Sequence, residues 1–196
     1  MRPRDENKEL LIRQKAIEII VNNGIDGFSI NKLAKAADVS PATIYIYYKD
    51  KDDLITRLCI DVANKMLEYS LADFSPEMDF AVGLKVQWKN RMDYFIKFPT
   101  EMEFIEIMRY TQYYNEASKA LTVNFGTVLG PFMENSIKKK QVVSLPFEVY
   151  WSIAYAPLYQ LMKYHHQGSS HVNNTFELNE ELSMQTLELV LKALKP

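Results

Sequence analysis

The segment from residue 40 to residue 47 carries side chains that suit contact with nucleic acid. On a short exposed helix, the hydroxyl of Thr43 could bond a base edge or a phosphate. The hydroxyls of Tyr45 and Tyr47 suit phosphate oxygens, which position a protein on a duplex without reading its sequence. The same segment also carries apolar side chains that suit contact with a thymine methyl group. These are Pro41, Ala42 and Ile46.

Residues on either side of this segment extend the candidate surface. Ser29 and Asn31 lie at the start of the preceding predicted helix, where they could reach the DNA backbone. Lys51 lies at the start of the following helix, where a cation and free N–H groups together favour phosphate. The full candidate set for DNA binding is Ser29, Asn31, Ser40, Pro41, Ala42, Thr43, Tyr45, Ile46, Tyr47 and Lys51.

Short helices with clear caps must position these side chains. A first helix is predicted over residues 6–22, with Leu10, Leu11, Ala16, Ile17, Ile20 and Val21 as its apolar face. Ser29 suits the cap of a second helix, and Ser40 before a proline suits the cap of a third. Asp50 is the expected cap of a fourth, and Asp38 occupies a tight turn between the second and third. This order of helix caps and a turn residue predicts a helix-turn-helix. Its buried residues are expected to be Leu33, Ala34, Ala37, Val39 and Ile44.

The runs Gly27–Ala34 and Val39–Leu54 resemble the N-terminal domain of the TetR family. The residues on the family's pattern are Thr43, Ile44, Tyr45, Tyr47, Tyr48, Lys49, Lys51 and Leu54. Asp38 and Ala42 stand where relatives often have glycine, and Ile46 stands where many have a polar or larger residue. The motif-level resemblance covers about residues 7–55, and it implies double-stranded operator DNA, a homodimer and a small-molecule ligand.

The remainder of the chain is also predicted to be helical, which gives an all-α protein. We expect a DNA-binding domain over residues 1–50 and a ligand-binding and dimerisation domain over 51–196. Predicted helices of the second domain cover residues 75–98, a segment capped by Thr100 and Glu103, 115–139 with a kink or break near Gly130-Pro131, 146–168 and 178–194. The dimer interface is expected near 147–166 and 178–194, because the last helix carries an apolar stripe.

Aromatic and methionine side chains are frequent in this second domain. The resemblance implies an apolar ligand pocket, and the same residues at helical spacing also suit an ordinary core. Both interpretations stay open at this point. The candidate pocket set is Trp88, Met92, Phe95, Phe104, Met108, Tyr113, Phe125, Trp151, Tyr155 and Tyr159.

Composition narrows the class of protein. The net charge is −2, divided into +2 over residues 1–51 and −4 over the rest, which fits a local phosphate-binding surface. Cys59 is the single cysteine and suits a small buried hydrophobe in a reducing compartment. No segment approaches the roughly 18 apolar residues of a membrane span, so we expect a cytoplasmic protein without membrane contact. His165, His166 and His171 lack metal-ligand spacing.

These observations predict a TetR-like sequence-specific transcription regulator. The chain has no glycine-rich phosphate loop, nucleophile elbow or paired metal ligands, so we expect neither an enzyme nor a cofactor. The expected action is repression, released when a small apolar or aromatic ligand binds. The alternatives are a helical protein-interaction adaptor and a ligand-independent DNA-binding activator.

Overall fold

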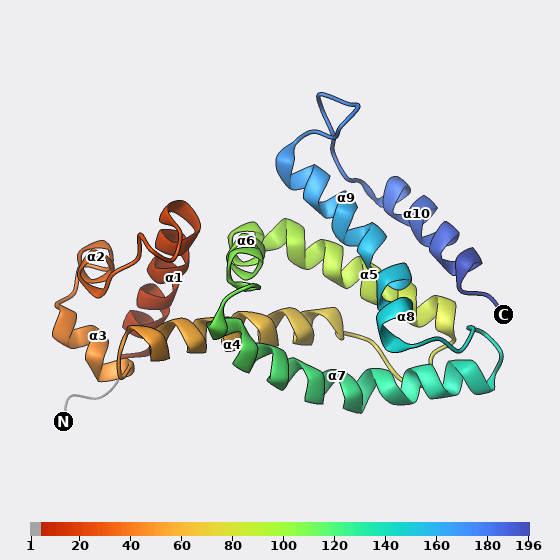
Figure 1. Cartoon of the computed structure of the whole chain (residues 1–196), viewed down its shortest axis with the longest axis horizontal. Coiled ribbons are helices and arrows are strands. Elements are labelled where there is room, and N and C mark those ends of the chain that lie inside the picture. Colours follow the sequence, from red (N-terminus) through yellow and green to blue (C-terminus); the bar gives the residue numbers. More distant parts are fainter. Residues whose placement is uncertain (1–4) are drawn as a thin grey trace. The chain divides into compact units, whose positions relative to one another are not determined.

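The computed structural model describes residues 5–196, except for the side chains at positions 120, 121 and 123–125. Over this part of the chain, helices are joined by turns and loops without any strand, which confirms the all-α prediction (Figure 1). The helices group into two compact units, which are described separately: the first reaches to Lys65 and includes 98–122, and the second holds 66–97 and 123–196. The predicted functional boundary after residue 50 stays a prediction.

The first unit is built on the N-terminal helices. Its elements are α1 (Glu6–Asn23), α2 (Ile30–Ala36), α3 (Pro41–Tyr47), the first part of α4 (Lys51–Ser70), α6 (Pro99–Met108) and the beginning of α7 (Gln112–Lys138). Helix α1 packs against α2 and α6, and α2 packs against α3. Ile12, Ile20, Leu33, Ile44 and Leu54 are fully buried in its core. Each such side chain stabilises the fold by about 1.5–3 kcal/mol, which fixes α2 and α3 against α1.

Side-chain caps set the boundaries of the short helices. Ser29 accepts a hydrogen bond from the backbone N–H three residues later, and Ser40 does the same for the N–H of Thr43. Asp50 caps α4 by accepting from the N–H of Asp53 at 2.8 Å. Helix α1 ends at Asn23, and the next residue, Gly24, has a φ of 68° that suits glycine. The predicted caps and the predicted end of the first helix are therefore confirmed.

One part of the predicted apolar face of α1 is wrong. Leu10 is 65% exposed and Leu11 is 40% exposed, although both were expected to face inward. The buried stripe instead follows Ile12, Ala16 and Ile20, which recur every four residues and share one face of the helix. The two leucines fall outside that stripe.

The second unit contains α5 (Phe80–Lys97), α8 (Phe147–Ala154), α9 (Ala156–Gln167), α10 (Glu180–Ala193) and the remaining parts of α4 and α7. Helix α9 packs against α5, α8 and α10, and α10 also packs against α5 and α8 (Figure 1). Trp88, Phe132 and Leu158, on α5, α7 and α9, are fully buried in this unit. The backbone N–H of Val143 donates to the carbonyl of Leu194 and ties the end of the chain to this unit.

Two predicted helix starts are corrected. Helix α5 begins at Phe80 rather than near Ser75, whose hydroxyl instead bonds the side chain of Glu77 within the preceding turn. Helix α6 begins at Pro99, one residue before the predicted cap Thr100, and no side-chain cap bond is present there. Proline is favoured at the first helical position because it has no N–H to satisfy.

Two predictions about helix interruptions are compared with the structure. Helix α7 continues through Pro131, so a break there is wrong, and the alternative prediction of a kink stays a prediction. The helix predicted over 146–168 is instead divided at Tyr155, where α8 ends and α9 begins. Pro157 explains this division, since it lacks an N–H and its ring clashes with the preceding helical turn. The predicted end at Gly168 is confirmed by its left-handed conformation.

Candidate nucleic-acid interface

Helices α2 and α3 form a helix-turn-helix within the first unit. The turn places Asp38 at a φ of 51°, a left-handed conformation that aspartate tolerates better than most residues. The N–H of Val39 then donates to the carbonyl of Ala34 at 2.9 Å and closes the turn. Leu33, Ala34, Ala37 and Ile44 are buried as predicted, whereas Val39 is only half-buried.

One face of α3 carries exposed side chains, most of them apolar. Tyr45 is 53% exposed and Ile46 is 51% exposed. Pro41 and Ala42, at the start of the same helix, are exposed as well. Exposed aromatic and aliphatic side chains on a seven-residue helix gain nothing from the protein's own core, so this face is free to contact a partner.

The polar candidate residues around α3 differ in their exposure and in the hydrogen bonds that they already make. The Thr43 hydroxyl is 2.9 Å from the Ser40 hydroxyl, so the two share a hydrogen bond and Thr43 is half-buried. Asn31 is exposed on α2, and Ser29 is half-buried because its hydroxyl caps that helix. Hydroxyls that pair with each other in the free protein can exchange that bond for one to a base or phosphate.

The structure contradicts the predicted outward position of Tyr47. Its side chain is only 5% exposed, and its hydroxyl lies 3.2 Å from both the N–H and the carbonyl oxygen of Asp5. Ile44, Tyr47 and Tyr48 follow the spacing of three and four residues that defines one helix face, and all three point into the core. Tyr47 therefore fixes the chain entering α1 rather than presenting its hydroxyl to DNA.

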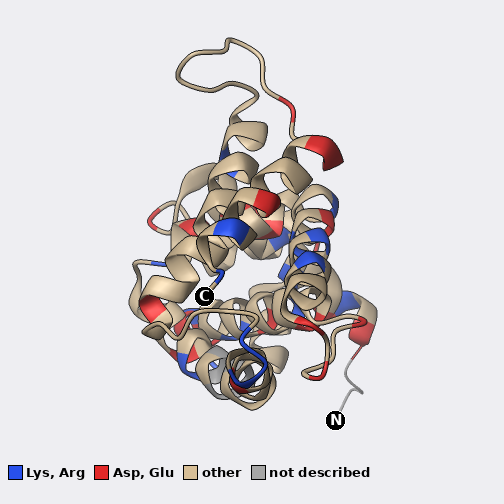
Figure 2. Cartoon of the chain, turned by 90° about the vertical axis from the view of Figure 1, so that its right-hand side faces the viewer, with Lys and Arg blue, Asp and Glu red and all other residues tan. Residues whose placement is uncertain are grey.

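The side chain of Lys51 also makes contacts within the first unit. Its Nζ donates to the carbonyl of Phe28 at 3.2 Å and lies 5.8 Å from the centre of the Phe28 ring. Lys49 is exposed, while its backbone N–H donates to Asp53. Sequence reasoning placed Lys49 in the family pattern but left it out of the candidate contacts, although its position two residues after the end of α3 and its exposure suit a phosphate. Figure 2 shows lysine and arginine interspersed with acidic residues along the helices.

Burial shifts two pKa values in this unit. Burial, followed by the negative charge of Glu9, raises the pKa of Tyr48 to about 12. Burial alone raises the pKa of the Cys59 thiol to about 12. The thiol therefore stays protonated at neutral pH, which supports the interpretation of Cys59 as a small hydrophobe. Both groups are packing residues of the first unit.

The candidate ligand-pocket set is divided between the two units. Phe104 and Met108 are fully buried in the first unit, and the hydroxyl of Tyr113 donates to Asp52 at 2.7 Å. The side chain of Phe125 lies outside the described residues. The members in the second unit are Trp88, Met92, Phe95, Trp151, Tyr155 and Tyr159. The pocket itself stays a prediction.

Buried polar side chains accompany the aromatics of the second unit, and sequence reasoning missed them. Arg91 is 3% exposed and Gln87 is fully buried, both on α5. Nη1 of Arg91 donates to the Tyr159 hydroxyl at 2.9 Å, and the Tyr155 hydroxyl donates to Oε1 of Gln87 at 2.5 Å. The spacing of four residues between Gln87 and Arg91 on a helix rich in buried apolar positions was the available indication.

The histidines of the α9 region have structural contacts. Nδ1 of His165 accepts a hydrogen bond from the N–H of Leu178 at 3.1 Å, which holds the loop before α10. The rings of His165 and His166 both lie near Phe95. Among the side chains that the structure describes, no group of three histidine, cysteine or acidic residues is arranged to hold a metal ion. No helix in the described part of the chain has the length and apolar character required to cross a membrane.

Comparison with known sequences places the helix-turn-helix in a family. Residues 12–58 match the family described as "Bacterial regulatory proteins, tetR family". An uncharacterised HTH-type transcriptional regulator of Haemophilus influenzae is 32% identical over 72 residues, covering 37% of this chain and 38% of that protein. The fatty acid metabolism regulator protein of Bacillus subtilis is 34% identical over 61 residues, or 31% of each chain. The chain thus matches about a third of the length of these curated relatives.

Solved structures are similar over nearly the whole chain. A TetR family transcription regulator from Marinobacter aquaeolei VT8 superposes with a TM-score of 0.84 at 23% identity, covering 100% of this chain and 99% of that one. The transcriptional regulator FadR from Bacillus subtilis, in complex with stearoyl-CoA, gives a TM-score of 0.74 at 16% identity over 95% and 99% of the two chains. Residues 12–58 of this chain therefore match the TetR family of bacterial regulatory proteins, and the chain as a whole has the fold of solved structures described as TetR family regulators.

Proposed function

We propose that this protein is a sequence-specific transcription regulator that binds double-stranded DNA as a homodimer. The observation that carries the proposal is the exposed face of α3, where Tyr45 and Ile46 are each about half exposed on the second helix of a helix-turn-helix. In this motif the second helix enters the major groove and its side chains contact base edges. The caps at Ser29 and Ser40 hold that helix at a fixed angle for docking.

The proposal assigns different roles to the residues of this face. Ile46 and Ala42 contact thymine methyl groups, and Thr43 bonds a base edge or an adjacent phosphate. Tyr45 and Lys49 contact phosphate oxygens and set the register of the helix on the duplex. An apolar reading surface of this kind favours operators with thymines at the positions that face Ile46 and Ala42.

A dimer is needed because one short helix reads too few base pairs to be selective. Two copies related by a twofold axis place two recognition helices about 34 Å apart, in successive major grooves. The second unit supplies exposed apolar side chains for such an interface, among them Phe147 and Val149 on α8 and Leu189 on α10. Their burial against a second copy would remove apolar surface from water. The proposed interface stays on residues 147–166 and 178–194.

The proposed regulation is repression released by a small ligand. The B. subtilis FadR structure contains stearoyl-CoA, which supports ligand control in a protein of this fold. A ligand can release DNA only through its different affinity for the DNA-competent and DNA-incompetent conformations. The proposed ligand binds among the aromatics of the second unit, and the cytoplasm is the proposed location of the regulator.

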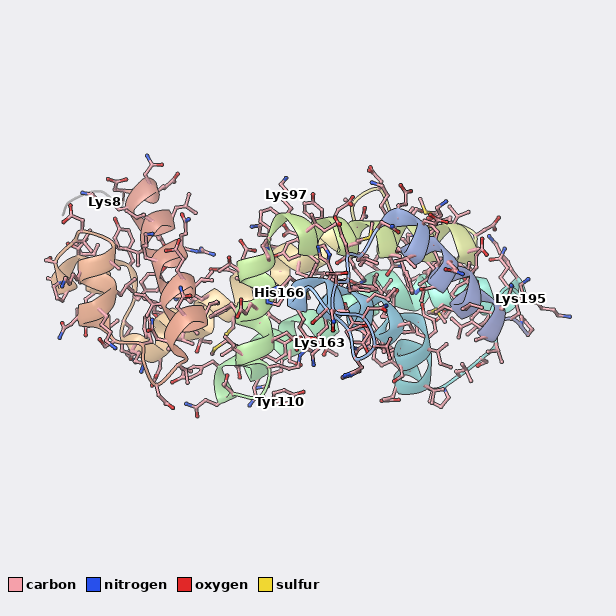
Figure 3. The ribbon with its side chains drawn as sticks, turned by 90° about the horizontal axis from the view of Figure 1, so that it is seen from above. Lys8, Lys97, Tyr110, Lys163, His166 and Lys195 are labelled. Atoms are coloured by element: carbon pink, nitrogen blue, oxygen red, sulfur yellow. The ribbon has the colours of Figure 1, made fainter. Side chains whose placement is uncertain are left out.

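Selection of genomic DNA followed by footprinting tests this function. The purified full chain should retain a limited set of fragments and protect two half-sites separated by about one helical turn. Tyr45→Ala should weaken retention of all fragments, whereas Thr43→Val should change which fragments are retained. Tyr110→Ala is the matched control, because Tyr110 is 91% exposed in the turn after α6 and outside the candidate surface (Figure 3). Equal retention of random fragments would overturn the proposal.

A further inference from the structure

An open hollow lies at the end of the second unit where α5 begins and where α7 and α10 end (Figure 1). Its volume of about 750 Å³ falls within the range of about 300–1,000 Å³ that small-molecule sites occupy. Three segments of the chain form its walls: residues 79–82, residues 140–141 and one side of residues 188–196. All three belong to the second unit, so the hollow is complete within one compact unit.

Hydrogen bonds between distant parts of the chain hold these walls in place. Oε1 of Gln141 accepts from the backbone N–H of Phe80 at 3.0 Å, and Nε2 of Gln141 donates to Asp79 at 2.8 Å. The N–H of Val143 donates to the carbonyl of Leu194 at 2.9 Å and fixes the residues after α10. The hollow is therefore already formed in the free protein, as is usual for small-molecule sites.

Three exposed lysines without ion pairs converge on this hollow. They are Lys140 from the turn after α7, Lys192 from α10 and Lys195 from the residues that follow (Figure 3). None of the three forms an ion pair with another residue that the structure describes. Lys139, by contrast, lies 3.6 Å from Asp79 and matches the charge of that carboxylate. Glu188 is the remaining acidic side chain of the lining, which leaves the side chains of the hollow with a positive excess.

Lys140 has a backbone conformation that disfavours lysine. Its φ is 56°, in the left-handed region where glycine is preferred. The N–H of Lys140 donates to the carbonyl of Ile137, and the N–H of Gln141 donates to that of Ser136, which closes α7 with the turn that usually contains glycine here. Folding alone thus favours glycine at this position, whereas a ligand in the hollow gives the lysine side chain a role.

The rest of the lining offers apolar surface. Val82 is 53% exposed at the start of α5, and Leu191 on α10 is half-buried. An apolar group that fills the hollow would remove both side chains from water. Leu191 shares one face of α10 with Glu188 and Lys192, because these positions follow the helical spacing of three and four residues. Leu189, which we propose for the dimer interface, lies outside that face.

We infer that this hollow binds a small soluble phosphate monoester, whose phosphate is held by Lys140, Lys192 and Lys195 and whose apolar group covers Val82 and Leu191. Lysine ammonium groups bind phosphate oxygens as point charges. A phosphate monoester carries a charge of about −1.5 to −2 at neutral pH, which suits several lysines better than a single carboxylate does. The inference goes beyond the proposed function, because the hollow is separate from the aromatic residues proposed for the releasing ligand.

Three probes separate the two halves of the site. Phenyl phosphate has both a ring and a phosphate, inorganic phosphate lacks the ring, and benzyl alcohol lacks the charge. Calorimetry on the full chain should show saturable binding of phenyl phosphate, at least about fivefold tighter than that of either other probe. Phenyl phosphate should also raise the Tm as its concentration increases. Equal affinities for phenyl phosphate and inorganic phosphate, or no saturable binding, would overturn the inference.

Substitutions at the lysines distinguish a ligand site from solvated surface charge. Lys140→Gly should weaken phenyl phosphate binding by about three- to tenfold, while the Tm without ligand stays equal or rises because glycine suits the left-handed φ. Adding Lys192→Met should weaken binding further. Lys163→Met is the matched control, because Lys163 is exposed on α9 outside the hollow, and it should leave the affinity unchanged. An unchanged affinity in the double variant would overturn the inference.

A last comparison tests whether the phosphate comes from a soluble compound or from a lipid headgroup. Vesicles of phosphatidylcholine that contain phosphatidic acid present the same phosphate monoester on a membrane. Because the hollow is concave and holds a compact ligand, the full chain should not sediment with these vesicles under conditions where phenyl phosphate binds. Sedimentation that depends on Lys140 and Lys192, in a protein that does not bind phenyl phosphate, would overturn the assignment of a soluble ligand.

Discussion

The two units depart from the usual distribution of apolar and polar residues in opposite directions. The first unit exposes apolar side chains, with Tyr45 and Ile46 each about half exposed on α3. The second unit buries polar side chains, with Arg91 3% exposed and Gln87 fully buried. A sequence selected only for folding would bury its apolar side chains and expose its polar ones at these positions. Folding alone explains neither exception, and the exposed face of the first unit is the surface that we propose for DNA.

The exposed face of α3 gives the largest expected effect. Ile46→Asp introduces a negative charge toward the phosphates and removes an apolar contact, so operator affinity should fall by roughly 10–100-fold without loss of thermal stability. Fluorescence anisotropy with the footprinted duplex measures this change. Ile96→Asp is the matched control, since Ile96 on α5 is 52% exposed, nearly the same as the 51% of Ile46. Equal losses in both variants would remove the special role of α3.

Packing within the second unit can be tested with a pair of helical glycines. A Cβ at Gly83 would lie 2.6 Å from Cε2 of Phe132, whereas a Cβ at Gly126 has nothing within 4 Å. Gly83→Ala should therefore lower the free energy of unfolding by about 1–3 kcal/mol. Gly126→Ala should raise it by about 0.5–1 kcal/mol, because alanine favours a helix. Urea denaturation measures both, and a stabilising Gly83→Ala would show that the core around Phe132 is loosely packed.

The buried phenol of Tyr48 should make the first unit sensitive to alkali. Its pKa is about 12 in the folded protein against 10.0 for the ordinary value, so the folded state keeps a proton that the unfolded chain releases. This contribution to stability is complete below pH 10 and is lost as the pH rises toward 12. Tyr48→Phe should therefore reduce the loss of stability between pH 9 and pH 11 by about 1.4 kcal/mol. Identical pH profiles for the two proteins would contradict this assignment.

The smallest expected effect separates two neighbouring tyrosines. Tyr47→Phe removes the hydroxyl that bonds the backbone of Asp5, so the free energy of unfolding should fall by about 0.5–1.5 kcal/mol while operator affinity stays nearly unchanged. Tyr45→Phe should do the reverse and weaken DNA binding at constant stability. Thermal denaturation and anisotropy on the same samples measure both. If Tyr47→Phe weakened DNA binding more than Tyr45→Phe, the assignment of Tyr47 to the core would be wrong.

Local signals made the first unit predictable from the sequence. Caps such as Ser29, Ser40 and Asp50 act over three residues, and the left-handed turn at Asp38 depends on one residue. Exposure within α3 was harder to predict, because Tyr45 and Tyr47 have the same chemistry and only helix phase separates them. The phase set by Ile44 was sufficient to place Tyr47 inside.

The polar contacts of the second unit could not be predicted from the sequence, because they form between residues that are far apart along the chain. Its aromatics were identified, but the buried pair of Gln87 and Arg91 becomes visible only when α8 and α9 bring Tyr155 and Tyr159 against α5. Polar residues on an otherwise apolar helix suggest a solvated face when they are read alone. The division at Pro157 was a missed local signal, since proline inside a predicted helix indicates an interruption.

The central claim is that the exposed face of α3 gives sequence-specific binding to DNA. The most direct measurement is the affinity of the full chain for its footprinted duplex and for a shuffled duplex of equal length and composition, across a range of salt concentrations. We predict an affinity at least about 10³-fold higher for the footprinted duplex at physiological salt, and binding that weakens as salt rises because counterions are released. Equal affinity for the two duplexes, or a salt dependence near zero, would contradict it.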